Sequence, residues 1–246
     1  MPVPELQVGG VTPLTTIDYP GELAAVVFCQ GCPWRCRYCH NPELLPRRGR
    51  SVVAWNDVAR FLERRRGLLD AVVFSGGEPT LQPVLESALD EVTALGFKVG
   101  LHTAGIYPKR LERLLPKLDW VGLDVKADPE RYPMLTGVPG SGARAWHSVR
   151  LLIESGTPHE MRITMHPAFT DRAQAMGIRD RLQSMGAQRV VVQPARNGND
   201  PLPVPSLSAN GRDDRASDRD DDGLCRPRHA APAHESADPE SLRRTA

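Results

Sequence analysis

Short apolar runs alternate with longer amphipathic segments along most of the chain. The apolar runs are rich in Val, Leu and Ile, and they predict six β-strands, at residues 23–28, 70–75, 97–103, 120–126, 161–165 and 189–194. Segments with helical spacing lie between them, at residues 56–66, 83–95, 109–117, 146–155 and 171–185. In the first of these segments, Asn56 is expected to cap the helix and Gly67 to end it.

This alternation predicts an α/β fold with a parallel sheet and right-handed crossovers. Six strand-then-helix units are too few for a full eight-stranded barrel, and the pattern allows either a doubly wound open sheet or a partial barrel. In both folds, functional side chains gather at the carboxyl ends of the strands. We predict an N-terminal segment at residues 1–22, a core at residues 23–194 and a tail at residues 195–246.

The tail differs from the core in composition. It has almost no apolar periodicity and is rich in Asp, Arg, Pro, Ala and Ser, which predicts a disordered, low-complexity segment. One cysteine, Cys225, lies in it and is expected to be an incidental thiol rather than a ligand.

Composition and charge narrow the classes of function. Of the 246 residues, 40% are hydrophobic and 25% charged, and the net charge of +1 gives no basic field for a nucleic-acid partner. The N-terminus does not resemble a signal peptide, and no apolar stretch approaches the length of a membrane span. We therefore expect a cytoplasmic protein without a membrane partner. In that reducing compartment, clustered cysteines are more often metal ligands or redox groups than disulfides.

Four cysteines fall within eleven residues, in the pattern C-x2-C-x3-C-x2-C from Cys29 to Cys39. A structural zinc site usually has its two cysteine pairs well separated in sequence, whereas an iron–sulfur cluster tolerates tight spacing. Cys32, Cys36 and Cys39 form a three-ligand set, which would leave one iron of a four-iron cube open. Cys29 would block that iron as a fourth ligand, so it is expected to be a small buried side chain.

The stretch GCPWRCRYCHNPE resembles the signature loop of radical S-adenosylmethionine (SAM) enzymes, through Cys32, Cys36, Tyr38 and Cys39. The resemblance implies a 4Fe–4S cluster bound by the three cysteines and SAM chelated at the open iron. It also implies a 5′-deoxyadenosyl radical that abstracts hydrogen. The fold expected from the six units is then a partial (β/α)6 TIM-like barrel of parallel strands.

Further motifs resemble segments of the same superfamily that contact SAM. By itself, GGEPT could be a tight turn, and Asp124 with Lys126 a structural ion pair. By resemblance, GGEPT would hold the ammonium group of SAM, and Asp124 and Lys126 would approach its ribose and carboxylate. Arg162 could meet the same carboxylate. The stretch HTAG matches a T-N-G motif except at Ala104. No catalytic side chain is assigned, and His102 and His166 are given no role. The expected cofactor-binding residues are Tyr38, Gly76, Gly77, Glu78, Pro79, Thr103, Asp124, Lys126 and Arg162.

The stretch TTIDYPGELAAVVFCQGCPWRCRYCHNPELLP resembles the opening of anaerobic ribonucleoside-triphosphate reductase activating proteins. This implies an oxidoreductase that generates a glycyl radical on a partner enzyme, with a low-potential electron donor such as flavodoxin or ferredoxin. Two alternatives remain open. One is a radical SAM enzyme that acts on a small molecule, for example a pterin-like substrate. The other is a structural zinc or electron-transfer iron–sulfur protein without enzymatic activity.

Overall fold

A seven-stranded sheet organises the part of the chain that the structure describes. The computed structural model describes residues 5–47 and 53–195, which belong to one compact unit. Six parallel strands follow one another in chain order, and a further strand, β1, pairs antiparallel with the first of them. The strands are β1 (Val8–Thr15), β2 (Ala24–Cys29), β3 (Ala71–Gly76), β4 (Lys98–Thr103), β5 (Trp120–Asp124), β6 (His159–Met165) and β7 (Val190–Pro194).

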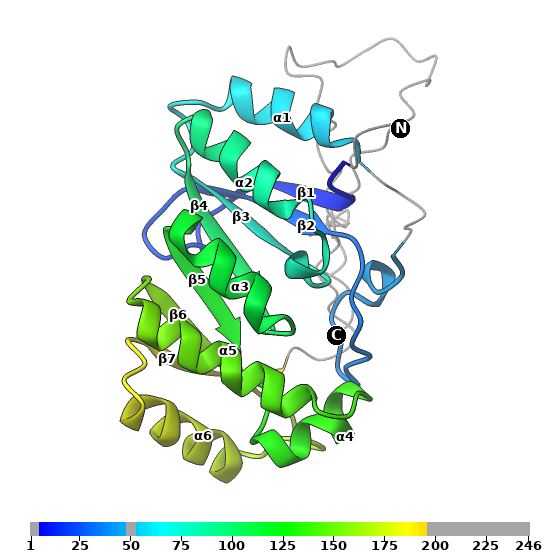
Figure 1. Ribbon diagram of the computed structural model, residues 1–246, viewed down its shortest axis with the longest axis vertical. Helices are drawn as coiled ribbons and strands as arrows, with labels where there is room; N and C mark the ends of the chain where they lie inside the picture. Colours follow the sequence, from blue (N-terminus) through cyan, green and yellow to red (C-terminus); the bar gives the residue numbers. More distant parts are fainter. Residues whose placement is uncertain (1–4, 48–52, 196–246) are drawn as a thin grey trace, which may run out of the picture. The chain divides into compact units, whose positions relative to one another are not determined.

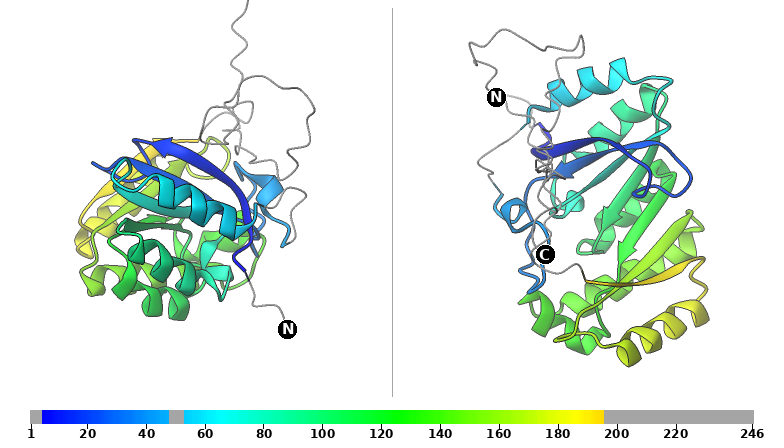
Figure 2. Two further views of the ribbon diagram at one scale, coloured as in Figure 1. Left: turned by 90° about the horizontal axis from the view of Figure 1, so that it is seen from above. Right: turned by 180° about the vertical axis from the view of Figure 1, so that it is seen from behind.

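The helices cover one face of this curved sheet (Figures 1 and 2). Within the described residues the α-helices are α1 (Trp55–Arg64), α2 (Leu85–Ala94), α3 (Pro108–Leu114), α4 (Tyr132–Thr136), α5 (Ser141–Ser155) and α6 (Arg172–Ser184). The described residues also contain the 3-10 turns η1 (Pro42–Leu44), η2 (Pro79–Leu81), η3 (Leu115–Lys117) and η4 (Pro129–Arg131).

The predicted α/β fold with six parallel strands is confirmed. β1 and β7 are the outer strands and do not pair with each other, so the sheet is an open, partial barrel of the predicted kind. β1 was not predicted from the sequence and lies in the segment assigned to residues 1–22. The predicted cap at Asn56 is wrong, because α1 begins one residue earlier, after Ala54, and has no side-chain cap.

Strand alternation separates the two faces of the sheet. Inward-facing Ala24, Val26, Ala71 and Val73 form a buried cluster with Trp120 and with Tyr19 from the β1–β2 connection. The residues between them face the helices, where the rings of Trp55 in α1 and Phe74 in β3 lie 6.1 Å apart. Both faces of β2 to β6 are therefore largely covered, as their apolar sequences require, whereas β7 is only partly buried.

The β1–β2 connection folds back into the barrel. The Tyr19 ring lies 5.3 Å from the Trp120 ring, and a side chain at Gly100 would come within 3.0 Å of Tyr19. Tyr19 can pack in this position because Gly100 has no side chain. In the same connection, the Asp18 carboxylate accepts a hydrogen bond from Thr15 Oγ1 at 2.6 Å.

Two expectations stay predictions. No helix in residues 5–47 and 53–195 is long and apolar enough to cross a bilayer, and the cytoplasmic location is a prediction from sequence. The predicted tail, with Cys225, lies outside the described residues apart from residue 195.

Candidate cluster and cofactor site

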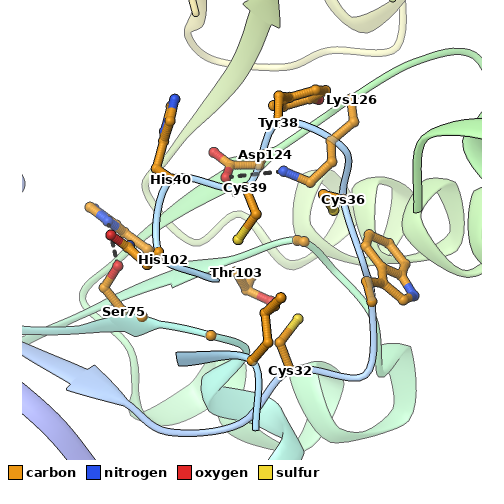
Figure 3. Close-up of a pocket in the computed structure, with 16 residues that line it drawn as sticks. Cys32, Cys36, Tyr38, Cys39, His40, Ser75, His102, Thr103, Asp124 and Lys126 are labelled. Carbon is orange, nitrogen blue, oxygen red and sulfur yellow. Dashed lines mark hydrogen bonds and ion pairs between the residues drawn. The ribbon is translucent and has the colours of Figure 1, made fainter. Parts of the chain in front are cut away.

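A cavity lies where β2, β3, β4 and β5 end and is closed on one side by the cysteine loop, residues 30–46 (Figure 3). Its position at the carboxyl ends of parallel strands is where this fold class carries its sites. The cavity is lined by Cys32, Trp34, Cys36, Tyr38, Cys39, His40, Asn41, Leu45, Ser75, Gly76, Gly77, His102, Thr103, Ala104, Asp124 and Lys126.

Gln30 holds the two ends of the cysteine loop together. Its buried side-chain amide donates to the carbonyl oxygens of Glu43 and Pro46, at 3.1 and 2.7 Å. Backbone bonds from Gly31 to Leu44 and from Cys32 to Leu45 continue the closure. These bonds define the shape of the loop. The sequence analysis gave Gln30 no role.

The segment after β5 supports the middle of the cysteine loop. The backbone N–H of Arg35 donates to the carbonyl of Thr136 at 2.9 Å, and that of Arg37 to the carbonyl of Leu135 at 3.1 Å. Directly before Arg35, the fully buried Trp34 packs edge-on against Tyr132. Helix α4, which the sequence did not predict, is thus the support for the cysteine loop.

The turn after β6 is a third support of the cysteine loop, and it acts through Tyr38. Its ring stacks on His166 with centroids 5.6 Å apart, and His166 in turn lies 4.6 Å from Phe169, in the turn that follows β6. Lys126 Nζ lies 5.7 Å from the Tyr38 ring. Tyr38 therefore lines the cavity and also anchors the cysteine loop.

Gly76 and Gly77 bring the end of β3 against the start of the cysteine loop. A side chain at Gly76, which has a φ of 108°, would lie 2.6 Å from the backbone nitrogen of Cys29. One at Gly77 would collide with the carbonyl oxygen of Gly31. Both positions line the cavity, and their lack of side chains is a packing requirement in its own right.

Glu78 is buried behind the cavity and does not line it. Its carboxylate accepts hydrogen bonds from the Thr80 hydroxyl and backbone, from Thr103 Oγ1 at 2.7 Å and from the Ala104 backbone at 3.0 Å. Burial raises the pKa of Glu78, and these bonds oppose the rise. Glu78 ties the turns after β3 and β4 together, and its contact with SAM stays a prediction.

Asp124, Lys126 and Arg162 form a charged group across the cavity from Ser75 (Figure 3 shows the first two). Asp124 lies 3.6 Å from Lys126 Nζ and 3.4 Å from Arg162 Nε. Burial would raise the pKa of Asp124, but the two cations hold it below its usual value. Asp124 and Lys126 line the cavity, whereas Arg162 and Pro79 do not. Arg162 lies against Gly122, where a side chain would meet its guanidinium.

The three predicted ligands Cys32, Cys36 and Cys39 have free thiols and surround one space (Figure 3). Among the described residues, no three His, Cys, Asp or Glu side chains converge closely enough to bind a single metal ion. A 4Fe–4S cube takes its thiolates at separate corners and so fits a wider arrangement. Burial raises the pKa of Cys32 to about 12, so binding of metal has to displace the proton.

Cys29 lies apart from these three. It is fully buried at the end of β2, between Val8 of β1 and Gly76 of β3, and does not line the cavity. This placement agrees with the expectation that Cys29 is a neighbour and not a ligand.

His102 and Ser75 line the cavity although the sequence analysis assigned neither of them. They are the last inward-facing residues before the ends of β4 and β3. The sequence could have predicted this placement. Side chains alternate between the two faces along a strand, so the inward-facing residue near the end of each strand lies at the same edge of the sheet.

Comparison with known proteins agrees with this geometry. The sequence pattern of the Radical SAM superfamily matches residues 26–176, which is more than half of the chain and includes the cavity-lining residues. The chain belongs to the radical SAM superfamily. Its members use a 4Fe–4S cluster and SAM, and the three thiols in one cavity fit that cofactor set.

Within the superfamily, the chain resembles glycyl-radical-activating enzymes. It is 39% identical over 134 residues to a protein of Methanocaldococcus jannaschii provisionally named a glycyl-radical enzyme activating enzyme, covering 51% of this chain and 52% of that protein. It is 33% identical over 162 residues to the pyruvate formate-lyase-activating enzyme of Clostridium pasteurianum, covering 63% of this chain and 66% of that enzyme. The chain thus matches between half and two thirds of these relatives' lengths.

Solved structures share the fold. The chain aligns with SuiB of Streptococcus suis, in the structure bound to S-adenosylmethionine, with a TM-score of 0.53 and 19% identity. The alignment covers 68% of this chain and 39% of SuiB. At that identity, the likeness supports the architecture alone.

Proposed function

We propose that the protein is a glycyl-radical-enzyme activase that cleaves SAM reductively and removes a hydrogen atom from a backbone glycine of a partner enzyme. The observation that carries the proposal is the convergence of Cys32, Cys36 and Cys39 on one cavity with the ends of β3, β4 and β5. The names of the relatives support the activase class.

The residues of the cavity would divide the work of binding. The three thiolates would hold the cluster, while Asp124 and Lys126 present one carboxylate and one ammonium group to the ribose and carboxylate of SAM. When bound, the cluster would supply the one electron needed to cleave SAM into methionine and a 5′-deoxyadenosyl radical. Transfer of a hydrogen atom from the glycine to that radical would leave 5′-deoxyadenosine and a glycyl radical on the partner. The protein orients the reactants and limits the access of water.

For the partner, anaerobic ribonucleoside-triphosphate reductase is supported by the resemblance of residues 15–46. Pyruvate formate-lyase is a second candidate, because enzymes named for its activation are among the relatives. In the described residues β1 and β7 do not pair, and a large substrate would approach through the side of the barrel that they leave open. A low-potential electron donor such as flavodoxin or ferredoxin belongs to the same proposal.

Electron paramagnetic resonance tests the proposal. The cluster-loaded, reduced protein is mixed with SAM and, separately, with each of the two candidate partners. A glycine-centred radical on one partner identifies it and supports the activase function. Formation of 5′-deoxyadenosine with no radical on either would favour the small-molecule alternative. Absence of SAM cleavage in iron-loaded protein would overturn the enzymatic function.

A further inference from the structure

The outer face of the cysteine loop carries arginines that the function proposed above does not use. Along the loop, Trp34, Cys36 and Tyr38 line the cavity, whereas Arg35 and Arg37 between them do not and are exposed. One side of the loop therefore faces the cavity of the three thiols, and the other side faces solvent. The two arginines are the direct neighbours of Cys36, one of these thiols.

Arg35 and Arg144 lie beside the end of α4. A side chain at Gly137, directly after α4, would lie 4.0 Å from Arg35 Cβ. Two residues further on, the Pro139 carbonyl oxygen accepts a hydrogen bond from Arg144 Nη2 at 3.4 Å. The Arg35 guanidinium is held by two backbone carbonyls of the cysteine loop, at 2.8 and 3.2 Å. Both side chains therefore lie where the cysteine loop meets α4 (Figures 1 and 2).

Arg37 and Arg131 meet at Phe169, in the turn after β6. The Arg37 guanidinium lies 5.8 Å from the centre of the Phe169 ring, and Arg131 Nη2 donates to the Phe169 carbonyl at 2.9 Å. Three residues after Arg131, the side chain of Met134 in α4 is 45% exposed. We call these residues the basic face, which consists of Arg35, Arg37, Arg131, Met134 and Arg144.

The positive charge of the basic face is not neutralised by the residues that the structure describes. Among them, none of its four arginines forms an ion pair, and each contacts a carbonyl oxygen or a ring instead. Residues 29–42 and 131–153 contain no Asp or Glu. Just before α4, Asp128 is paired with Arg181, and Glu130 is exposed. Because the whole chain has a net charge of only +1, the basic face is a local concentration of positive charge.

We propose that the basic face is the docking surface of an acidic electron-carrier protein, which passes one electron across the cysteine loop to the cluster. The carrier is oxidised by one electron, and the cluster is reduced by one. A concentrated positive charge attracts an acidic surface and speeds its association, and Arg and Met are enriched in protein interfaces. The inference rests on the proposed function, since that function needs a one-electron reductant.

The position of the basic face favours the carrier over the glycyl-radical partner as its occupant. The glycine of the partner has to enter the cavity, whereas an electron can cross the loop at Cys36, between the two arginines. Because Arg35 and Arg37 do not line the cavity, a carrier docked on them would leave it free for SAM and the glycine.

Rates of cluster reduction test the docking surface. Cluster-loaded, oxidised protein is mixed with photoreduced flavodoxin or with reduced ferredoxin, and the reduced cluster is followed by rapid-freeze electron paramagnetic resonance. The variants are Arg37→Glu and Arg144→Glu. The matched control is Arg66→Glu, at an exposed position in the α1–β3 connection. Photoreduced 5-deazariboflavin, a small uncharged reductant, reports whether each variant still has a reducible cluster.

We expect each charge reversal on the basic face to slow reduction by the protein carrier roughly tenfold at about 0.01 M ionic strength, where the Debye length is about 30 Å. At about 1 M ionic strength, where it is about 3 Å, the rates should approach that of the wild type. Arg66→Glu should behave as the wild type under both conditions. Reduction by 5-deazariboflavin should be the same in all four proteins.

Four results would count against specific parts of the argument. Equal rates for the wild type and both variants at low salt would overturn the docking surface. Slower glycyl-radical formation by the variants with 5-deazariboflavin as the reductant would make the basic face a site for the glycyl-radical partner instead. Reduction of the wild type by 5-deazariboflavin alone would exclude both acidic carriers as the occupant. If the reduced wild type cleaved no SAM, the proposed function itself would fail.

Discussion

Burial gives two side chains beside the cavity proton affinities that differ from those in the unfolded chain. The pKa of His102 falls to about 3, and the pKa of Glu78 rises. A group whose pKa changes on folding makes stability depend on pH, with opposite signs for these two residues. At the scale of single residues, the cavity therefore affects stability as well as binding.

The His102 effect predicts a loss of stability in acid. Below pH 6.5 the unfolded chain binds a proton at this histidine, whereas the folded chain binds it only near pH 3. The free energy of unfolding should thus fall as the pH drops through that window, by up to about 1.4 kcal/mol per pH unit for this one proton. Urea unfolding at several pH values should show a shallower fall for His102→Gln than for the wild type. Parallel curves would contradict the prediction.

We predict that three of the four clustered cysteines bind the iron–sulfur cluster and that the fourth, Cys29, does not. Cys29→Ser should keep the iron content and SAM cleavage of the wild type, because Cys29 is buried away from the cavity. The same change at Cys32, Cys36 or Cys39 should abolish both. Iron analysis and the yield of 5′-deoxyadenosine test this. Loss of iron in Cys29→Ser, with the fold intact by circular dichroism, would make Cys29 a ligand.

At the scale of elements, the cysteine loop depends on supports that are distant in sequence. Gln30 closes its ends, α4 carries its middle and the turn after β6 packs against Tyr38. Gly76 and Gly77 let β3 approach it closely. The position of the ligands is thus a property of β3, α4 and β6 together with the loop.

A pair of glycine substitutions tests this dependence. Gly77→Ala should displace the cysteine loop, because the added methyl group collides with the Gly31 carbonyl. The free energy of unfolding should fall by about 1–3 kcal/mol, and the protein should lose its iron. Gly177→Ala, in exposed open space on α6, should stabilise the fold by up to about 1 kcal/mol and keep the iron. Chemical unfolding and iron analysis give both readouts. Full iron binding by Gly77→Ala would show that the loop tolerates the shift.

At the scale of the whole molecule, the sequence predicts strand order better than it predicts contacts. Apolar periodicity located all six parallel strands, because β2 to β6 are largely buried and β7, although only partly buried, contains a run of three valines. It missed β1, which among the strands of the described residues pairs with β2 alone, and whose sequence, with two glycines and a proline, lacks a strong strand signal. The cysteine spacing predicted three side chains around one space, and the structure brings Cys32, Cys36 and Cys39 to one cavity. The burial of Glu78 behind that cavity could not be predicted, because periodicity ends with the strand and does not say how the following turn folds.

The open site predicts sensitivity to oxygen. Cys32, Cys36 and Cys39 are each partly exposed, and the cavity lies at the open end of the strands. Iron at a corner without a protein ligand should therefore be oxidised and lost in air, and bound SAM should slow the loss by covering it. Visible absorption of the cluster, followed after aeration with and without SAM, measures both rates. A cluster stable through prolonged aeration would contradict the prediction.

The strands lie in the sheet in the same order as in the chain, and this order affects how the protein folds during its synthesis. Each strand pairs with its predecessor, so during synthesis the sheet can grow one strand at a time from the N-terminus. The cysteine loop emerges early, but Asp124, Lys126 and its support at residues 132–136 come much later. The thiols therefore spend an interval without their scaffold, and cluster insertion into a finished site has to wait until the ribosome has passed α4.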